Sequence, residues 1–315
     1  MSNQATIVVL GSSNVDLITY CHEFPKNGET IMATSFSQSF GGKGANQAVQ
    51  AAKLSESPNY VAMLGMVGTD TYGRETRDNF TSCNVGVKEL KEGKESSGLA
   101  TIQVDSHGEN RICIIPGANY ELQPTDVSSM TSTISSASYM VCQFEIDPLT
   151  TACGFEIAKS HGLTTVLNPA PAAPLSTLPP GLLSNTDYLV PNQPELSLLS
   201  GLPTSTVPEC VEASRSLIST FSITTVIVTM GSSGSLLVTS TSTLHVPCPS
   251  LPSPLLDTVG AGDSFLGALV YYLSRGVGME GAMGKANGIA GYSVGGKGAQ
   301  TSYKSRDELP EEFRI

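Results

Sequence analysis

The segment with the clearest potential for chemistry is residues 257–265, which read Asp-Thr-Val-Gly-Ala-Gly-Asp-Ser-Phe. Three small residues, Gly260, Ala261 and Gly262, precede an apolar stretch that predicts a helix. Small residues let a ligand approach the backbone, and the N–H groups of a helix start favour a phosphate or a developing anion. Asp263 would repel a bound phosphate, which favours a role as the base that takes a proton from an attacking hydroxyl. Acids are common in first helical turns, but the preceding Gly-Ala-Gly favours the catalytic interpretation.

A second glycine-rich segment, residues 40–48 (Phe-Gly-Gly-Lys-Gly-Ala-Asn-Gln-Ala), also runs into a predicted helix. Residues 11–16 (Gly-Ser-Ser-Asn-Val-Asp) follow the first predicted strand. In open α/β sheets ligands bind beyond the carboxyl ends of the strands. Asn14, Asp16 and Asn46 would offer the donors and acceptors that a polyhydroxylated ligand requires. Each feature alone could be a turn or a cap, but together they predict a binding site.

The elements that must position these residues alternate between β-branched runs and helical patterns, which predicts an α/β fold with a mostly parallel, Rossmann-like central sheet flanked by helices. The predicted strands are residues 5–10, 60–64, 139–144, 164–167, 188–190 and 225–229. The predicted helices lie at about 43–54, 71–82, 148–160, 207–220, 263–275 and 280–292. Two segments rich in Ser, Thr and Pro, 171–186 and 239–254, are expected to be loops.

Two regions, residues 17–40 and 98–115, break this alternation. Both alternate polar and apolar residues without a helix between them, and residues 101–115 predict a β-hairpin. Two such pieces could form a small sheet that stands off the main domain as a lid.

The composition of the chain argues against some classes of partner and indicates a cellular compartment. The chain has 315 residues and a formal net charge of −11, which suits one large α/β domain and argues against nucleic acid or an anionic membrane as a partner. Seven cysteines without framework spacing are expected to be free thiols in a reducing compartment, and no stretch reaches membrane-spanning length. A cytoplasmic protein is therefore expected.

Four motifs in order resemble the ribokinase family of carbohydrate kinases, the phosphofructokinase-B type. Residues 41–48 and 257–265 resemble its two signatures, and residues 168–172 (Asn-Pro-Ala-Pro-Ala) and 191–195 (Pro-Asn-Gln-Pro-Glu) resemble motifs between them. The resemblance covers nearly the whole chain. It implies one kinase domain over residues 1–315, with lid segments at about 15–40 and 96–117.

By position, the resemblance implies a role for each matching residue. Asp263 would be the base, and Gly260, Ala261 and Gly262 the anion hole. Sugar contacts would come from Asn14, Asp16, Gly42, Lys43, Gly44, Ala45, Asn46, Glu145 and Asp263. ATP contacts would come from Asn192, Thr229, Met230, Gly231, Ser232, Ser233, Gly234, Gly262, Asp263 and Asn287. Glu195 would help to hold Mg²⁺ through water, and a K⁺ loop would comprise Asp257, Val259, Ser293, Gly296, Gly298 and Ser302.

The activity that the resemblance implies is ATP-dependent phosphorylation of D-ribose at its 5-hydroxyl, which gives ribose 5-phosphate and ADP. Two alternatives stay open: a kinase for another sugar or a nucleoside, and a sugar-binding sensor without turnover. Because an exposed lid sheet has unpaired edges and an apolar face, a homodimer through the lids is also expected.

Overall fold

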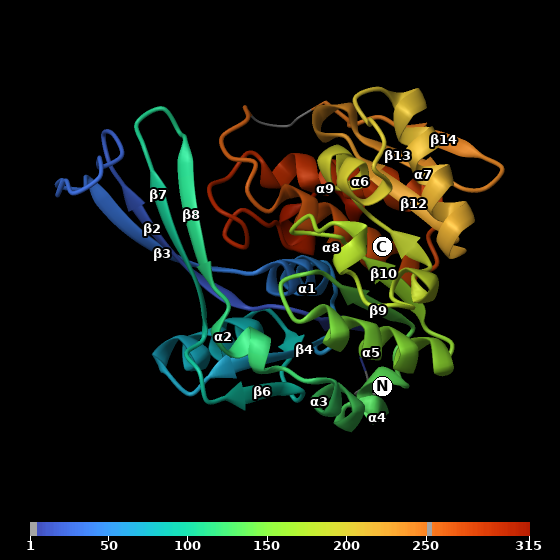
Figure 1. Cartoon of the computed structure of the whole chain (residues 1–315), viewed down its shortest axis with the longest axis horizontal. Coiled ribbons are helices and arrows are strands. Elements are labelled where there is room, and N and C mark those ends of the chain that lie inside the picture. Colours follow the sequence, from blue (N-terminus) through green and yellow to red (C-terminus); the bar gives the residue numbers. More distant parts are fainter. Residues whose placement is uncertain (1–4, 251–253) are drawn as a thin grey trace.

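The computed structural model describes residues 5–250 and 254–315, and a ten-stranded sheet runs through its centre (Figure 1). Its strand order is β14 (Thr243–Val246), β13 (Ser235–Val238), β12 (Thr225–Thr229), β11 (Tyr188–Leu189), β10 (Thr164–Leu167), β9 (Tyr139–Cys142), β1 (Ile7–Leu10), β4 (Val61–Gly68) and β5 (Val85–Gly86), with β6 (Leu90–Gly93) also on β4. In this order, the neighbours from β12 to β5 pair in parallel, and β13 and β14 add an antiparallel edge.

Helices cover both faces of this sheet because its strands are apolar on both sides. Ile7 and Val9 of β1 belong to one hydrophobic cluster, and Val8 and Leu10 to the other. The first cluster includes side chains of α1 (Lys43–Lys53), α2 (Thr71–Ser82), α8 (Ala261–Ser274) and α9 (Met279–Ser293). The second includes side chains of α3 (Pro124–Ser129), α4 (Thr131–Ile134), α5 (Pro148–Ser160), α6 (Gln193–Ser200) and α7 (Val207–Phe221). The predicted fold class is confirmed.

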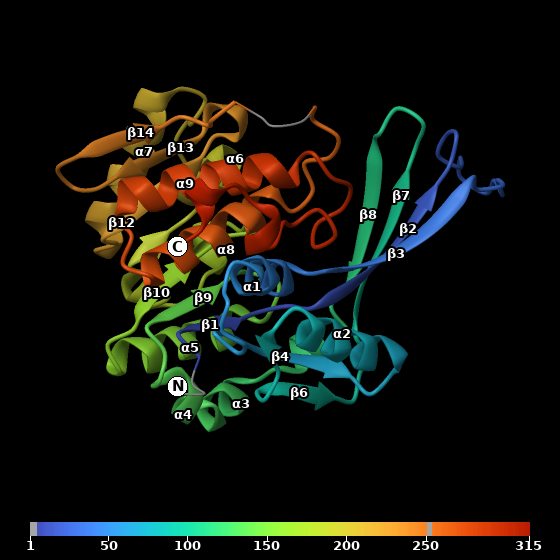
Figure 2. The same cartoon turned by 180° about the vertical axis from the view of Figure 1, so that it is seen from behind.

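The second sheet has four strands in the order β3-β2-β7-β8 and projects from the main body (Figure 2). It consists of β2 (Asn14–Tyr20), β3 (Ser35–Gly41), β7 (Gly98–Val104) and β8 (Asn110–Ile115). β2 pairs in parallel with β7, and both outer pairings are antiparallel. The small sheet predicted from residues 17–40 and 98–115 is therefore confirmed, and we call it the lid sheet.

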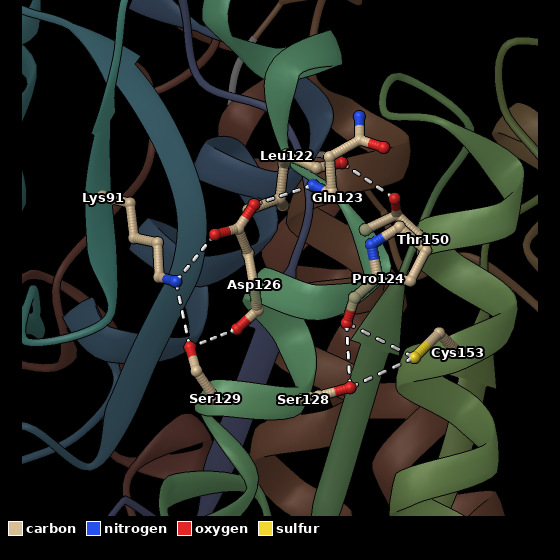
Figure 3. Close-up of polar contacts among 9 residues, drawn as sticks. All are labelled: Lys91, Leu122, Gln123, Pro124, Asp126, Ser128, Ser129, Thr150 and Cys153. Atoms are coloured by element: carbon tan, nitrogen blue, oxygen red, sulfur yellow. Dashed lines mark hydrogen bonds and ion pairs between the residues drawn. The ribbon is translucent and has the colours of Figure 1, made fainter.

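The chain that returns from the lid sheet is anchored by the polar contacts shown in Figure 3. Lys91 Nζ, at β6, lies 2.8 Å from Asp126 Oδ1 in α3, whose Oδ2 accepts the backbone N–H of Gln123 at 3.0 Å. Thr150 Oγ1 of α5 donates to the carbonyl of Leu122 at 2.8 Å. These contacts tie α3 to the sheet on one side and to α5 on the other.

One expectation was wrong. Residues 239–254 were predicted to be a loop, but they include β14, which pairs with β13. Leu244 and Val246 turn inward while Thr243 and His245 are exposed, so the strand is a half-buried edge in which threonine and serine are tolerated. Part of the segment, 251–253, lies outside the described residues. The six predicted strands and six predicted helices are confirmed, with small shifts at their ends.

No helix in the described ranges is both long and apolar enough to cross a membrane.

Candidate active site

Two cavities meet at the start of α8, where β10, β11 and β12 end. The larger has a volume of about 320 Å³ and the smaller about 180 Å³. Asn192, Thr229 and Gly262 line both of them, so the two cavities are adjacent. The smaller cavity also contains Lys43 and Asp263 in its wall. Ligands bound side by side in these cavities would meet beside Gly262, the residue before Asp263.

The helix start at the junction is shaped by glycine. Gly260, the N-cap of α8, has a φ of 74°, and a Cβ there would lie 2.6 Å from the hydroxyl of Tyr303. That hydroxyl donates to the Gly260 carbonyl at 2.8 Å. A Cβ on Gly262 would meet no protein atom within 4 Å, because this residue faces the cavity. The backbone of Gly262 is therefore open to a ligand, whereas the N–H of Ala261 already donates to Thr258 at 3.2 Å.

Asp263 is buried, with 7% of its surface exposed. Its Oδ2 accepts from Asn46 Nδ2 at 3.0 Å, and its Oδ1 accepts from Gln47 Nε2 at 2.8 Å. Burial raises the pKa of Asp263, while Lys43 and the two amide donors oppose that rise. The result is a carboxylate with a fixed orientation and a raised pKa, properties that suit a general base.

Lys43 brings positive charge to the smaller cavity. Burial disfavours its ammonium, but the carboxylates of Asp263, Glu145 and Glu195 outweigh that effect and raise the pKa of Lys43. The side chain is therefore charged at neutral pH. A cation beside Asp263 and Gly262 can bind a phosphate that is transferred between the two cavities.

The predicted sugar-binding residues gather where β2 begins. Glu145 Oε2 accepts from Ser12 Oγ at 2.6 Å and from the backbone N–H of Lys43 at 3.0 Å, which joins the end of β9 to the start of α1. Asn14 Oδ1 accepts from Asn119 Nδ2 at 2.8 Å. Burial, with a smaller contribution from Glu145, raises the pKa of Asp16 to about 7.

Two residues predicted to contact the sugar, Gly44 and Ala45, also pack closely against the end of β1. Ala45 is 1% exposed within the hydrophobic core, and its N–H donates to the carbonyl of Ser12 at 2.8 Å. A Cβ on Gly44 would lie 2.7 Å from the backbone nitrogen of Ser12. Both residues let α1 pack against the end of β1, while Gly42, with a φ of 88°, turns the chain into that helix.

The larger cavity collects most of the residues predicted for ATP: Asn192, Thr229, Gly231, Ser232, Gly234, Gly262 and Asn287. Met230 packs in the hydrophobic core and Ser233 is exposed, so neither lines the cavity. Leu255, Phe265, Ala290 and Val294 add an apolar wall that the sequence did not indicate. Such a wall suits a flat aromatic ring.

The residues predicted to hold metal ions form two groups. Glu195 lines the smaller cavity, and its Oε2 accepts the backbone N–H of Asn192 at 2.9 Å. Burial raises its pKa, with Asn192 and Lys43 opposing. The predicted K⁺ residues lie around Asp257, whose carboxylate accepts the N–H of Val259 at 2.9 Å and that of Gly298 at 2.8 Å. The described residues contain no cluster of three or more His, Cys, Asp or Glu suited to a metal.

Several residues of the site had no predicted role: Ser12, Gln47, Asn119, Gln143, Asn168, Gln300 and Tyr303. Three carried a signal. Ser12 lies in the segment 11–16 after the first predicted strand, Gln47 follows Asn46 at a helix start, and Asn168 opens the Asn-Pro-Ala-Pro-Ala motif. The others are isolated polar residues that become informative only when the fold brings them together.

The arrangement agrees with the comparison to known families. The sequence model described as "pfkB family carbohydrate kinase" matches residues 4–306. This chain belongs to that family. The resemblance inferred from the four motifs is confirmed.

Individual pfkB family members are similar over almost their full lengths. A protein named deoxyribokinase from Salmonella typhi is 40% identical over 310 residues, which cover 98% of this chain and 99% of the relative. A mouse protein named ribokinase is 34% identical over 309 residues, which cover 97% of this chain and 94% of the relative. The solved structure of Arabidopsis thaliana ribokinase complexed with ribose and ATP aligns with a TM-score of 0.88, 29% identity and 99% coverage of both chains.

Proposed function

We propose that this carbohydrate kinase phosphorylates D-ribose at the 5-hydroxyl with ATP, giving ribose 5-phosphate and ADP. The observation that carries the proposal is the position of Asp263 in the wall of the smaller cavity, next to the open backbone of Gly262, which lines both cavities. The larger cavity, with its apolar wall, suits the nucleotide. The polar residues at the start of β2 suit the sugar.

In the proposed reaction, Asp263 accepts the proton of the 5-hydroxyl while that oxygen attacks the γ-phosphorus of ATP. The bond from this phosphorus to the ADP oxygen breaks as the new one forms. Gly262 presents its backbone, and Lys43 its ammonium, to the charge of the transferring group. The lid sheet excludes water that would otherwise take the place of the sugar.

The choice of ribose rests on the acceptors at the sugar end. The carboxylate of Asp16 lies against Gly41, and that of Glu145 accepts the backbone N–H of Lys43, so the two carboxylates flank the same short segment. A site built to bind a hydroxyl discriminates against an analogue that lacks it, because a buried polar group is then left without a partner. The rival is 2-deoxy-D-ribose, which the 40% identity to a protein named deoxyribokinase supports.

The decisive experiment measures ADP release with Mg-ATP over ribose, 2-deoxyribose, fructose, adenosine and no acceptor. We expect kcat/KM for ribose to exceed that for 2-deoxyribose by about tenfold, the effect of about 1.4 kcal/mol for one lost hydrogen bond. Product NMR should place the phosphate on C5. A preference for 2-deoxyribose would make that sugar the substrate in place of ribose. Ribose binding without any turnover would favour the alternative that the protein is a sugar-binding sensor.

Two cations complete the proposed site. Glu195 would hold Mg²⁺ through water, since Mg²⁺ with a nucleotide needs few protein carboxylates. The loops that Asp257 joins offer carboxylate and carbonyl oxygens, which are hard ligands suited to K⁺. Bound there, K⁺ would add positive potential behind the anion hole. The same panel in potassium and in sodium tests this site.

We also propose that residues 1–315 form one kinase domain whose lid, residues 15–40 and 96–117, pairs with that of a second copy. All six residues of β8 are exposed, among them Ile112, Ile114 and Ile115 with 52%, 50% and 44% of their surface exposed, and a second copy could bury these apolar side chains.

A location in the cytoplasm is supported by seven cysteines that form no disulfide.

Ile114→Glu is expected to convert a dimer into a monomer, because it buries a charge in the proposed lid contact. Light scattering on a sizing column at micromolar concentration measures the mass. Ser219→Glu, at an exposed position on α7, is the matched control and should stay dimeric. A monomeric unmodified protein under these conditions would exclude the lid dimer.

A further inference from the structure

Two chains of buried and half-buried side-chain amides converge on Asp263, one on each carboxylate oxygen. The reaction proposed above assigns no role to either chain. The first chain reaches Asp263 through Gln47, and the second through Asn46. Both continue into residues that touch neither cavity, except for Asn168, which lines the smaller one.

The first chain is fixed at two points. Gln47 Nε2 donates to Asp263 Oδ1 at 2.8 Å and to Asn168 Oδ1 at 3.1 Å. Its Oε1 accepts from Gln143 Nε2 at 2.6 Å. Asn168 in turn donates its Nδ2 to the carbonyl of Val190 at 3.0 Å, and a carbonyl can only accept. The orientation of Asn168, and hence of Gln47, follows from that backbone group.

Gln143 can adopt only one amide orientation without losing contacts. Its Oε1 lies against the backbone of Gly11, where an added Cβ would be 2.1 Å away, and has no hydrogen-bond partner within the described residues. Reversing the amide would place its NH₂ against Gly11 and set its oxygen against the oxygen of Gln47. The reversal would therefore replace a 2.6 Å hydrogen bond by a repulsive contact.

The second chain extends further, to the helix α2. Asn46 Nδ2 donates to Asp263 Oδ2 at 3.0 Å, and Asn46 Oδ1 accepts from Gln300 Nε2 at 3.1 Å. Gln300 Oε1 accepts from Asn79 Nδ2 at 2.9 Å. A carboxamide has its donor and its acceptor on opposite sides, so each bond in this chain dictates the direction of the next.

We propose that Asn79, Gln300, Gln143 and Asn168 are positioning residues: through the amides of Asn46 and Gln47 they hold one N–H donor on each oxygen of Asp263. Each carboxylate oxygen has about two acceptor positions, so one on each oxygen stays available for the sugar hydroxyl. The donors fix the plane of the carboxylate and favour its ionised form. The inference rests on the proposed role of Asp263 but not on the identity of the sugar.

Asn79 offers the sharpest test because it is half-buried and lies outside both cavities. Asn79→Leu removes the outermost donor without adding charge, so Gln300 and Asn46 can reverse. Asn79→Asp places an acceptor there and drives that reversal, which sets the oxygen of Asn46 against Asp263. Thr81→Asp is the matched control: it adds the same charge at an exposed position of α2, where the threonine hydroxyl donates to the backbone carbonyl of Arg77 at 2.9 Å.

The direct readout is the pKa of Asp263, from a ¹³C-carboxyl NMR titration of the free protein, which does not depend on turnover. We expect Asn79→Leu to raise it by about half a pH unit and Asn79→Asp by about one, the effect of weakening one hydrogen bond to a carboxylate. The charged and titratable groups that face Asp263 are Lys43, Glu145, Glu195 and Tyr303. All four are unchanged in these variants.

The kinetic readout uses whichever sugar the unmodified protein phosphorylates fastest. Turnover should fall about threefold in Asn79→Leu and about tenfold in Asn79→Asp, with the KM for ATP unchanged and the acidic limb of kcat moved to higher pH. Gln143→Met tests the other chain and should behave like Asn79→Leu once thermal unfolding shows that it folds.

An Asp263 pKa that is the same in Asn79→Leu, Gln143→Met and the unmodified protein would overturn the inference. So would equal shifts in Asn79→Asp and Thr81→Asp, since the effect would then be one of net charge. Absence of turnover from the unmodified protein would instead count against the proposed function, and the NMR titration would still decide the inference.

Discussion

Replacing Asp263 with asparagine is expected to lower kcat by about 10³-fold, within the range attributed to loss of a positioned general base. An amide cannot take up the proton of the attacking hydroxyl. The variant should fold: burial raises the pKa of Asp263, so its ionised form destabilises the folded state at neutral pH, and a neutral side chain removes that cost. The new NH₂ would face the N–H of Asn46 or Gln47, and reversal of one of these amides relieves that contact. Single-turnover kinetics with saturating ATP and sugar measure the effect.

The pH dependence gives a second check on Asp263. Activity of the unmodified protein should fall as the pH drops through the raised pKa of this carboxyl, because the base must be ionised. Asp263→Asn should lack that acidic limb while keeping its affinity for ATP in calorimetry. Near-native kcat in the folded variant would show that another group is the base.

Replacing Lys43 with methionine is expected to lower kcat/KM for ATP by about 10²-fold, comparable to the loss of one preorganised electrostatic contact. Its ammonium faces the carboxylates of Asp263, Glu145 and Glu195, and ATP would bring more negative charge to the same cavity. Without this cation, the charged side chains that line the cavity would be the carboxylates of Asp263 and Glu195, which repel a phosphate. Steady-state kinetics over a range of ATP concentrations measure the loss.

Lys43→Arg is the matched control because it keeps the charge but not the compact shape of an ammonium. It should recover part of the lost kcat/KM. Raising the salt concentration should narrow the gap between Lys43→Met and the unmodified protein, since screening weakens the interaction of the phosphate with charge. If Lys43→Met retains its kcat/KM for ATP, the cation serves the sugar or the fold instead.

The sequence was sufficient for the parts of the fold and site that depend on local pattern. Alternating strands and helices predicted the parallel sheet, and the interruptions at 17–40 and 98–115 predicted the lid sheet. Glycines before two helices predicted that Asn46 and Asp263 belong to a site, and their side chains lie 3.0 Å apart. Local pattern succeeds here because backbone geometry at a helix start restricts the residue type.

The sequence could not predict which polar side chains are hydrogen-bonded to each other. Gln300 reaches Asn46, and Asn119 reaches Asn14, across separations of 254 and 105 residues. An isolated glutamine or asparagine looks the same in a sequence whether its side chain is buried in a hydrogen-bond chain or exposed to solvent. β14 was missed for a related reason, since an edge strand tolerates serine and threonine that also favour loops.

The distance along the chain between Asn46 and Asp263, 217 residues, has a consequence for biosynthesis. Apart from Asp263 itself, the residues expected to contact the sugar all precede residue 146, whereas the proposed base arrives with α8, in the last fifth of the sequence. Contacts so remote in sequence are expected to form late during folding. A growing or partly folded chain therefore lacks the proposed base, and we expect it to transfer no phosphoryl group from ATP before α8 has packed against α1.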